Sequence, residues 1–207
     1  MGGQVHTSSK ARELVRNISE VHNLPVLCTY EHQDILSHNH SHYAGELGLR
    51  PPEPIRKNAL EADVVLVVGH RFNGVPNMAY KFPSSDQTFI HVLPDPNTIG
   101  KIFRTDMSVV ADSENFLEQL LNLKSRNVSV ERNEWVALCH QRYLHNDATQ
   151  PAKNANDGLD FAHLIDALGE LASENSVITN DAGNLTSWMH HRFPFKSSMT
   201  LIGSEIG

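Results

Sequence analysis

The stretch Asp63-Val64-Val65-Leu66-Val67-Val68-Gly69 indicates the fold class. It is apolar at every position between its ends, which is typical of a parallel strand covered by helices on both faces. Further strands are predicted at 24–29, 88–93 and 108–111, and helices at 9–22, 51–62 and 113–123. Because helices and strands alternate over short connections, we expect right-handed crossovers. The pattern predicts an α/β fold with a doubly wound, mostly parallel sheet.

The chain on either side of this sheet also carries signals. Met1-Gly2-Gly3 is similar to the tail of a first strand whose body is absent. A histidine-rich loop is expected after the strand at 24–29, ending in Tyr43-Ala44-Gly45-Glu46-Leu47-Gly48. A helix is expected over 134–146, and the Asn-, Asp-, Ala- and Pro-rich residues 146–158 are typical of a linker. An incomplete second α/β unit is expected to follow, with helices at 159–173 and 185–192 and strands at 177–179 and 199–202.

Composition excludes several classes of function. The 207 residues are 40% hydrophobic and 20% charged, as in ordinary soluble globular proteins. A net charge of −7 and the lack of a lysine or arginine run argue against a nucleic-acid partner. The longest apolar run is far shorter than the ~20 residues that span a bilayer, so we expect no membrane partner. The two cysteines predict reduced thiols in a cytoplasmic protein rather than a disulfide framework.

The thirteen histidines raise the question of a metal site. Four of them are close in sequence, at His32, His38, His40 and His42. Their spacing matches neither a helical pair nor a cysteine–histidine motif, so solvated or loop-packing roles are favoured. A histidine-rich metal-binding protein is kept as a third and weaker interpretation.

Two polar motifs follow predicted strands, where open parallel sheets bind ligands. Gly69-His70-Arg71 comes directly after the central strand, and Arg71 has the forked donors that suit a diphosphate. A plain surface turn explains it equally well. Asp95 ends the next strand and could accept a hydrogen bond from a ribose hydroxyl, although capping the turn begun by Pro96 is the favoured role.

A glycine turn joins the strand at 177–179 to the next helix. Asp181-Ala182-Gly183-Asn184-Leu185 would direct backbone N–H groups and the positive end of a helix dipole at one point, as a phosphate site requires. The alternative is a tight turn in which Asn184 caps the helix. No nucleophile elbow, P-loop, zinc-protease motif or Gly-x-Gly-x-x-Gly fingerprint is present. From the residues alone, the chain is a phosphate- or nucleotide-associated α/β protein with no assigned reaction.

The order of these motifs resembles a known family. Matching segments are Leu24-Pro25-Val26 with Thr29, residues 40–48, residues 62–72, residues 91–96 with Ile99-Gly100, Asp112, and residues 181–184 with Trp188. In this order they resemble thiamine-diphosphate-dependent enzymes of the acetolactate synthase, pyruvate oxidase and benzoylformate decarboxylase group. The resemblance covers nearly the whole chain.

The resemblance implies a fragment of a three-domain enzyme that acts on 2-oxo acids such as pyruvate, in branched-chain amino acid biosynthesis. Residues 1–123 would form the central Rossmann-like domain, 124–156 a linker with one helix, and 157–207 the start of the diphosphate-binding domain. Gly183, Asn184 and Leu185 would lie against thiamine diphosphate, and residues 203–207 would begin the loop that approaches its aminopyrimidine ring. The activating glutamate and the magnesium-binding motif would lie outside this chain, so no catalytic or metal residue is assigned here. The complete enzyme would be a cytoplasmic homodimer or homotetramer.

The chain also departs from the family. Glu31-His32-Gln33 stands where members that bind flavin or adenine nucleotides often have Gly-Lys-Gly, and Leu93 replaces an aspartate. Both changes argue against FAD, and Gly69, Arg71 and Asp95 are kept as possible nucleotide contacts. The alternative function is a non-catalytic nucleotide-binding α/β module. We also expect Phe161, Leu164 and Phe193 to be unusually exposed, because the second unit is incomplete.

Overall fold

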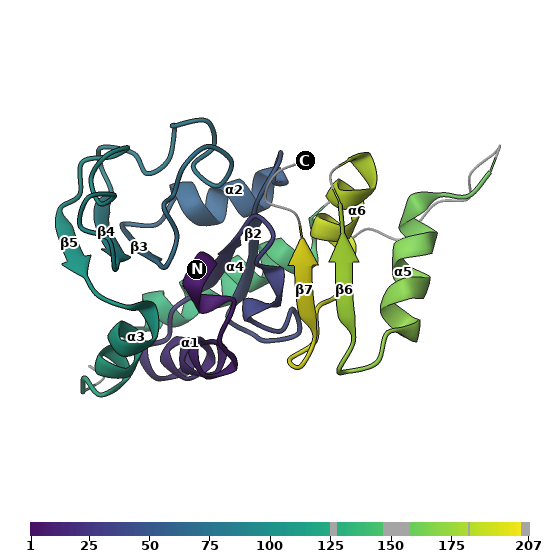
Figure 1. Cartoon of the computed structure of the whole chain (residues 1–207), viewed down its shortest axis with the longest axis horizontal. Coiled ribbons are helices and arrows are strands. Elements are labelled where there is room, and N and C mark those ends of the chain that lie inside the picture. The colour runs from purple at the N-terminus through teal and green to yellow at the C-terminus, as the bar shows by residue number, and fades with distance from the viewer. Residues whose placement is uncertain (125–127, 147–157, 182, 204–207) are drawn as a thin grey trace.

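A computed structural model describes residues 1–124, 128–146, 158–181 and 183–203 (Figure 1). Most of the predicted linker at 146–158, as well as Ala182 and residues 204–207, lies outside the described residues. The helices are α1 (Ser9–His22), α2 (Glu53–Leu60), α3 (Ser113–Leu121), α4 (Val130–Leu144), α5 (Phe161–Leu171) and α6 (Asn184–Arg192), with 3-10 turns η1 (Gly3–Val5) and η2 (Gln33–Ile35). The strands are β1 (Val26–Thr29), β2 (Tyr43–Leu47), β3 (Val64–Val68), β4 (Thr88–Leu93), β5 (Met107–Val110), β6 (Val177–Asn180) and β7 (Thr200–Gly203).

The first five strands form two parallel sheets, β1-β2 and β3-β4-β5. The N-terminal residues lie between the two sheets. The Met1 amino group donates to the Leu27 carbonyl at 3.0 Å, and the Met1 carbonyl accepts from the Thr29 N–H at 3.0 Å, which is the parallel-strand pattern. A Cβ on Gly3 would lie 2.0 Å from the carbonyl oxygen of Gly69, so this segment also touches the end of β3. Met1 therefore pairs as the predicted strand tail would.

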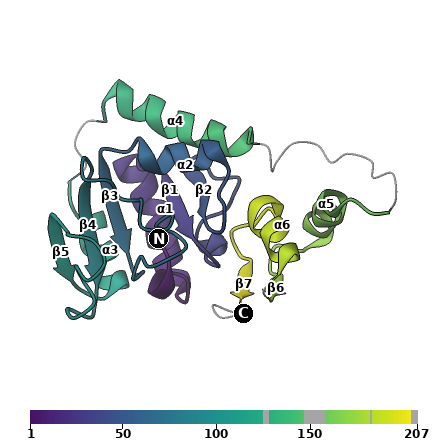
Figure 2. The ribbon, with the colours of Figure 1, turned by 90° about the horizontal axis from the view of Figure 1, so that it is seen from above.

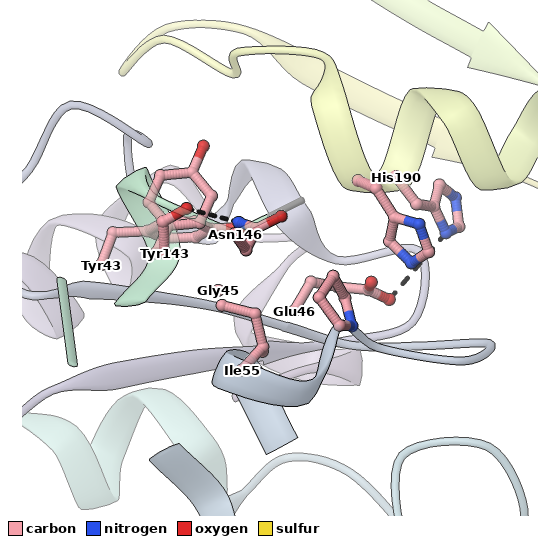
Figure 3. Close-up of a pocket in the computed structure, with 9 residues that line it drawn as sticks. Tyr43, Gly45, Glu46, Ile55, Tyr143, Asn146 and His190 are labelled. Atoms are coloured by element: carbon pink, nitrogen blue, oxygen red, sulfur yellow. Dashed lines mark hydrogen bonds and ion pairs between the residues drawn. The ribbon is translucent and has the colours of Figure 1, made fainter. Parts of the chain in front are cut away.

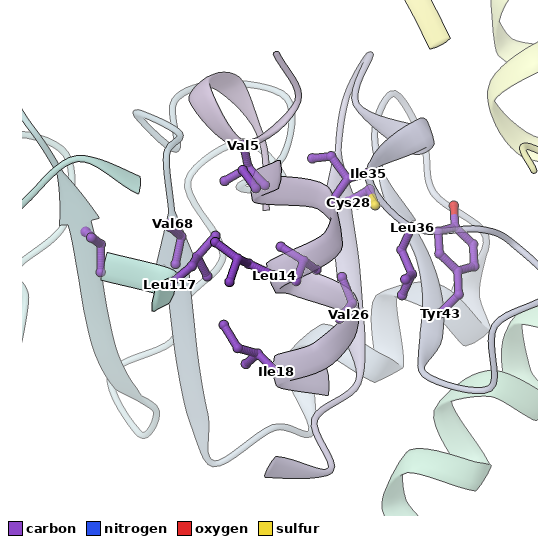
Figure 4. Packing of buried hydrophobic residues seen from close by; sticks show 13 residues of the cluster. Val5, Leu14, Ile18, Val26, Cys28, Ile35, Leu36, Tyr43, Val68 and Leu117 are labelled. Atoms are coloured by element: carbon purple, nitrogen blue, oxygen red, sulfur yellow. The ribbon is translucent and has the colours of Figure 1, made fainter. Parts of the chain in front are cut away.

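Helices cover both faces of this layer (Figure 2). On one face, Leu14 and Ile18 of α1 and Leu117 of α3 pack in one cluster with Val26 and Val68 (Figure 4). On the other face, Ile55 and Ala59 of α2 pack against the strands. Their partners are Val65 and Val67 of β3 and Phe89 of β4. Because neighbouring positions of β3 enter different clusters, both faces of the strand are covered. The predicted doubly wound parallel α/β fold is confirmed.

The prediction that residues 43–48 end a loop is wrong, because Tyr43–Leu47 form strand β2. All five residues of this strand are buried. The segment Tyr-Ala-Gly-Glu-Leu shows neither alternation nor an apolar run, so its sequence carries no strand signal. Contacts with α2 and α4 stabilise it instead. The His140 ring donates from Nδ1 to the Tyr43 carbonyl at 2.8 Å, and Asn58 Nδ2 donates to the Ala44 carbonyl at 2.9 Å.

The second unit has a parallel pair of strands, β6 and β7, with α5 and α6 packed against them. Its core cluster contains Ile165, Met189, Phe193, Phe195, Met199 and Leu201. The expected exposure of Phe161 is confirmed at 49%, and Leu164 is half-buried. The expectation for Phe193 is wrong, because its ring is fully buried beside Phe195. Among the described residues, no helix combines the length and apolarity that crossing a membrane requires.

Candidate functional site

The glycine turn between β6 and α6 leads directly into an exposed helix end. Gly183 immediately precedes the helix and has φ 140° and ψ −179°, a conformation that glycine adopts at no steric cost. Apart from its chain neighbours, no atom of the described residues lies within 4 Å of the position that a Cβ at Gly183 would take. Gly183, Asn184 and Leu185 are all exposed at the N-terminal end of α6. The first N–H groups of this helix are therefore accessible to a ligand.

The alternative, in which Asn184 caps α6, is wrong. Asn184 is the first residue of the helix, and the capping position belongs to Gly183, which supplies no side-chain acceptor. The turn is held instead by the Thr186 hydroxyl, which donates to the Asp181 carbonyl. Because Gly183 offers no side chain to cap α6, no acceptor from the N-cap residue competes with a negatively charged group for the helix end.

A group of buried polar side chains lies at the carboxyl-terminal end of the β6-β7 sheet. Asn180 and Gly203 end β6 and β7 in register, and Asn180 Nδ2 lies 3.2 Å from His190 Nε2. Glu31 comes from the loop after β1, and a Cβ on Gly203 would lie 1.5 Å from its carboxylate. Gly203 thus permits the central domain to contact the end of β7.

Glu46 of the central domain and His190 of the second unit face each other, with Glu46 Oε1 and His190 Nδ1 3.9 Å apart (Figure 3). Burial raises the pKa of Glu46 well above its usual value, and the nearby Glu31 raises it further. Burial also lowers the pKa of His190 to about 3. Both shifts favour the uncharged forms, so we treat the contact as one between a neutral carboxyl and a neutral imidazole. Sequence reasoning missed both residues, because β2 was not predicted and His190 lies in an ordinary helical pattern.

A small cavity adjoins this contact. It lies between β2, α2, α4 and α6, and its volume is about 10 Å³. Its polar lining comes from Glu46, Tyr143, Asn146, His190 and His191. A cavity of this size holds roughly one water molecule and no cofactor.

The possible nucleotide contacts lie on the other sheet. Gly69 follows the last residue of β3 and has φ 73°, and Arg71 is exposed and makes no hydrogen bond or ion pair with the described residues. Asp95 has the favoured structural role, because its carboxylate accepts from the Asn97 N–H at 2.9 Å and from the Thr98 hydroxyl at 2.6 Å. These hydrogen bonds lower the pKa of Asp95. Gly69, Arg71 and Asp95 therefore belong to the central sheet, whereas Gly183, Asn184 and Leu185 belong to the second unit.

The clustered histidines have separate partners. The His38 ring is buried and stacks on Tyr43, with ring centroids 4.1 Å apart. His40 lies 3.0 Å from a carboxylate oxygen of Glu20, and His42 lies 2.9 Å from Asn23 Oδ1. Within the described part of the chain, no group of three or more His, Cys, Asp or Glu side chains could hold a metal ion.

The doubly wound parallel sheet places the chain in the class of α/β proteins, in which ligands commonly bind at the carboxyl ends of strands, and the glycine turn lies at such an end. Comparison with known proteins is more specific. Residues 1–120 match the family described as "Thiamine pyrophosphate enzyme, central domain", and the chain belongs to this family.

Curated relatives extend the similarity over the second unit. The chain is 25% identical over 213 residues to a probable acetolactate synthase large subunit of Methanocaldococcus jannaschii, covering 98% of this chain and 35% of that protein. It is 27% identical over 193 residues to the acetolactate synthase isozyme 1 large subunit of Escherichia coli K12, covering 93% of this chain and 33% of the relative. Glyoxylate carboligase of Escherichia coli O157:H7 is 25% identical over 146 residues, or 68% of this chain and 24% of the relative. The chain spans about a third of the length of the acetolactate synthase subunits that it matches.

Proposed function

We propose that this chain forms the central domain and the first part of the cofactor-binding domain of an acetolactate-synthase-like enzyme. The complete enzyme would use thiamine diphosphate to decarboxylate or join 2-oxo acids such as pyruvate. One observation carries the proposal for this chain: Gly183 opens the N-terminus of α6 in a conformation that leaves the helix end uncapped and exposed. Membership of the thiamine pyrophosphate enzyme family supports thiamine diphosphate as the proposed anion.

The residues of the turn fit the diphosphate of this cofactor. Backbone N–H groups of Gly183, Asn184 and Leu185 would donate to its oxygens, and the dipole of α6 would favour its negative charge. When bound, thiamine diphosphate supplies the electron sink for cleavage next to the 2-oxo carbon. Magnesium would accompany the diphosphate, with ligands from outside this chain. We assign the chain a binding role and no catalytic residue.

The proposal extends to the organisation of the complete enzyme. We propose a central domain over residues 1–123, a connection over 124–156 and the start of the diphosphate-binding domain from 157. A homodimer or homotetramer in the cytoplasm is the proposed assembly. We do not extend the proposal to FAD or another nucleotide, because Asp95 is engaged in its own turn and His32 and His70 pack edge to face at the carboxyl ends of β1 and β3.

Inorganic pyrophosphate is the probe that tests the cradle. We expect titration of the ¹⁵N-labelled chain to shift the amide resonances of Gly183, Asn184 and Leu185, with a dissociation constant on the order of 1 mM. Gly183→Val should abolish these shifts, because a β-branched residue does not tolerate this φ. Gly100→Val is the matched control, since Gly100 also has a positive φ, 76°, and open space around it.

The outcome separates a cradle from an ordinary turn. Shifts at the three amides that survive in Gly100→Val and disappear in Gly183→Val support the proposal. If pyrophosphate moves resonances elsewhere and leaves these three unchanged, the turn does not hold a diphosphate and the proposed role of this chain is wrong.

A further inference from the structure

Strand β7 presents one backbone edge to the central domain. The Thr200 N–H donates to the Ser176 carbonyl at 3.1 Å, so Thr200 faces β6. In a strand, successive residues direct their backbone groups to opposite edges, so Met199 and Leu201 face away from β6. An edge strand of this kind needs partners for its N–H and C=O groups, or a cover.

Three side chains of the central domain supply these partners. Arg12 of α1 donates from Nη1 to the Met199 carbonyl at 3.0 Å. Asp34 of η2 accepts from the Leu201 N–H at 2.9 Å through Oδ2. His6, which follows η1, lies with Nε2 2.9 Å from the Leu201 carbonyl. Side chains from three separate elements thus bind alternate residues of one strand edge, as a neighbouring strand would.

Asp34 connects all three contacts. Its side chain is 0% exposed, and its carboxylate lies 3.3 Å from Arg12 Nη1 and 3.1 Å from His6 Nε2. A buried carboxylate is stable only when positive charges and hydrogen-bond donors surround it. Arg12 also lines a groove of about 500 Å³ between α1 and the turn at Ser197 and Ser198.

The groups that face His6 give this contact a pH dependence. The Asp34 carboxylate beside the ring raises the pKa of His6, whereas burial and the charge of Arg12 lower it by smaller amounts. The His32 ring lies edge to face with His6, its centroid 5.1 Å away, and burial lowers the pKa of His32 to about 4. Stability from protonated His6 is therefore fully present below pH 6.5 and is lost as the pH rises through the raised pKa of His6.

We propose that Asp34 is a positioning residue that, together with Arg12 and His6, holds β7 against the central domain. Protonation of His6 strengthens this attachment by placing a positive charge beside the Asp34 carboxylate. β7 ends at Gly203, at the same carboxyl-terminal end of the β6-β7 sheet that the turn at Gly183 follows. The attachment thereby fixes the carboxyl-terminal end of the β6-β7 sheet relative to the central domain. The consequence for a cofactor rests on the proposed function, whereas the attachment itself does not.

Amide hydrogen exchange of the full chain tests this proposal, because two neighbouring amides report different contacts. The Leu201 amide reports the bond to Asp34, and the Thr200 amide reports the pairing with β6. In Asp34→Ala we expect the protection of Leu201 to fall about tenfold to a hundredfold relative to Thr200. Asp34→Asn keeps an acceptor without the charge, so the loss should be smaller and independent of His6 titration.

The pH profile separates a positioning role from a merely structural one. After correction for intrinsic exchange, protection of Leu201 in the parent chain should be constant below pH 6.5 and fall as the pH rises above it, whereas it should not change with pH in His6→Gln. His22→Gln is the matched control, because His22 also contacts a backbone carbonyl, that of Leu120 at 3.0 Å, at the other end of α1.

Two results would overturn the proposal: a profile in His6→Gln that equals the parent's, or unchanged Leu201 protection in Asp34→Ala. If Asp34→Ala does not fold, the Asp34→Asn and His6→Gln profiles decide. No phosphate or cofactor is present in this assay, so its failure is distinct from failure of the pyrophosphate titration.

Discussion

Arg192 and Asp166 join α6 to α5 through two parallel hydrogen bonds, Nε to Oδ1 and Nη2 to Oδ2, each 2.6 Å long. The Arg192 side chain is 8% exposed and that of Asp166 is 42% exposed. α6 is the helix whose first turn forms the candidate cradle, and this pair anchors its last turn. The guanidinium and the carboxylate match in geometry, which a lysine cannot reproduce.

Arg192→Lys should therefore destabilise the second unit. We expect a loss of about 1 kcal/mol in the free energy of unfolding, which is below the roughly 1.5–3 kcal/mol of a charged hydrogen bond because Asp166 is partly solvated. Urea unfolding followed by Trp188 fluorescence measures it, in a Trp135→Phe background that leaves Trp188 as the sole tryptophan. Lys57→Ala removes the exposed pair with Glu53 and should leave the transition unchanged. Equal midpoints for Arg192→Lys and its parent would show that the paired geometry contributes nothing.

Asn58 of α2 connects this helix to β2 and α4 through hydrogen bonds of its side chain. Its Nδ2 group donates to the Ala44 carbonyl and to the Cys139 carbonyl, each at 2.9 Å, and the side chain is buried. Asn58→Ala leaves two buried carbonyls without this donor, so we expect a loss of about 2–3 kcal/mol in the free energy of unfolding. Urea denaturation followed by far-UV circular dichroism measures it. The exposed Asn73→Ala serves as the control, and a loss in Asn58→Ala no larger than the control's would contradict the prediction.

The helices and the strands with strong local patterns could be predicted from sequence. α1 and β4 have the predicted bounds, and α3 begins at the predicted residue; Ser8 and Asp112 cap these two helices. β2 could not be predicted, because its five residues are buried by α2 and α4 and carry no periodic signal of their own. Tertiary contacts decide this strand, and they outweigh a weak local preference.

The site was predictable to the same extent. The turn at Gly183 follows from local rules for glycine and helix ends, so its sequence signal was sufficient. Glu31, Glu46 and His190 meet only because β7 and α6 pack against the central domain, and no local pattern links residues so far apart in the chain. The same reason hides the contact between Asp34 and Leu201, which are separated by 167 positions.

Gly69 and Gly100 form a matched test of crowding at a strand end. Both have positive φ, 73° and 76°, but a Cβ at Gly69 would lie 2.7 Å from Ser113 Oγ and 2.8 Å from the Gly2 carbonyl oxygen. A Cβ at Gly100 would meet nothing within 4 Å. Gly100→Ala should cost only the left-handed backbone penalty of about 1–2 kcal/mol. Gly69→Ala should lose about 1–3 kcal/mol more, because backbone and side chain must move to admit the methyl group.

Thermal and urea unfolding of the two alanine variants, measured side by side, checks this difference. The common backbone penalty cancels in the comparison, which leaves the crowding at Gly69. Equal stability of the two variants would show that residues 2 and 113 move away from β3 without cost.

His38 should make the folded chain sensitive to acid. Burial lowers its pKa to about 3, and the neutral ring is matched to its surroundings: Nε2 lies 3.2 Å from the Gln33 carbonyl, and Nδ1 lies 3.1 Å from the Tyr143 hydroxyl. The ring thus donates at Nε2 and accepts at Nδ1. Between pH 6.5 and 3 the unfolded chain binds a proton at His38 that the folded chain does not, so stability falls as the pH is lowered through this window.

His38→Gln keeps a donor and an acceptor at this position but cannot titrate. Between pH 6 and 4, we expect the unfolding free energy of this variant to depend less steeply on pH than that of the parent. The difference in slope should be up to about 1.4 kcal/mol per pH unit, the contribution of one proton. Urea unfolding at four pH values gives the slope. The exposed His163→Gln is the control variant and should keep the parent's slope. If His38→Gln also keeps the parent's slope, the ring of His38 is protonated in the folded chain and its contact with the Tyr143 hydroxyl must have rearranged.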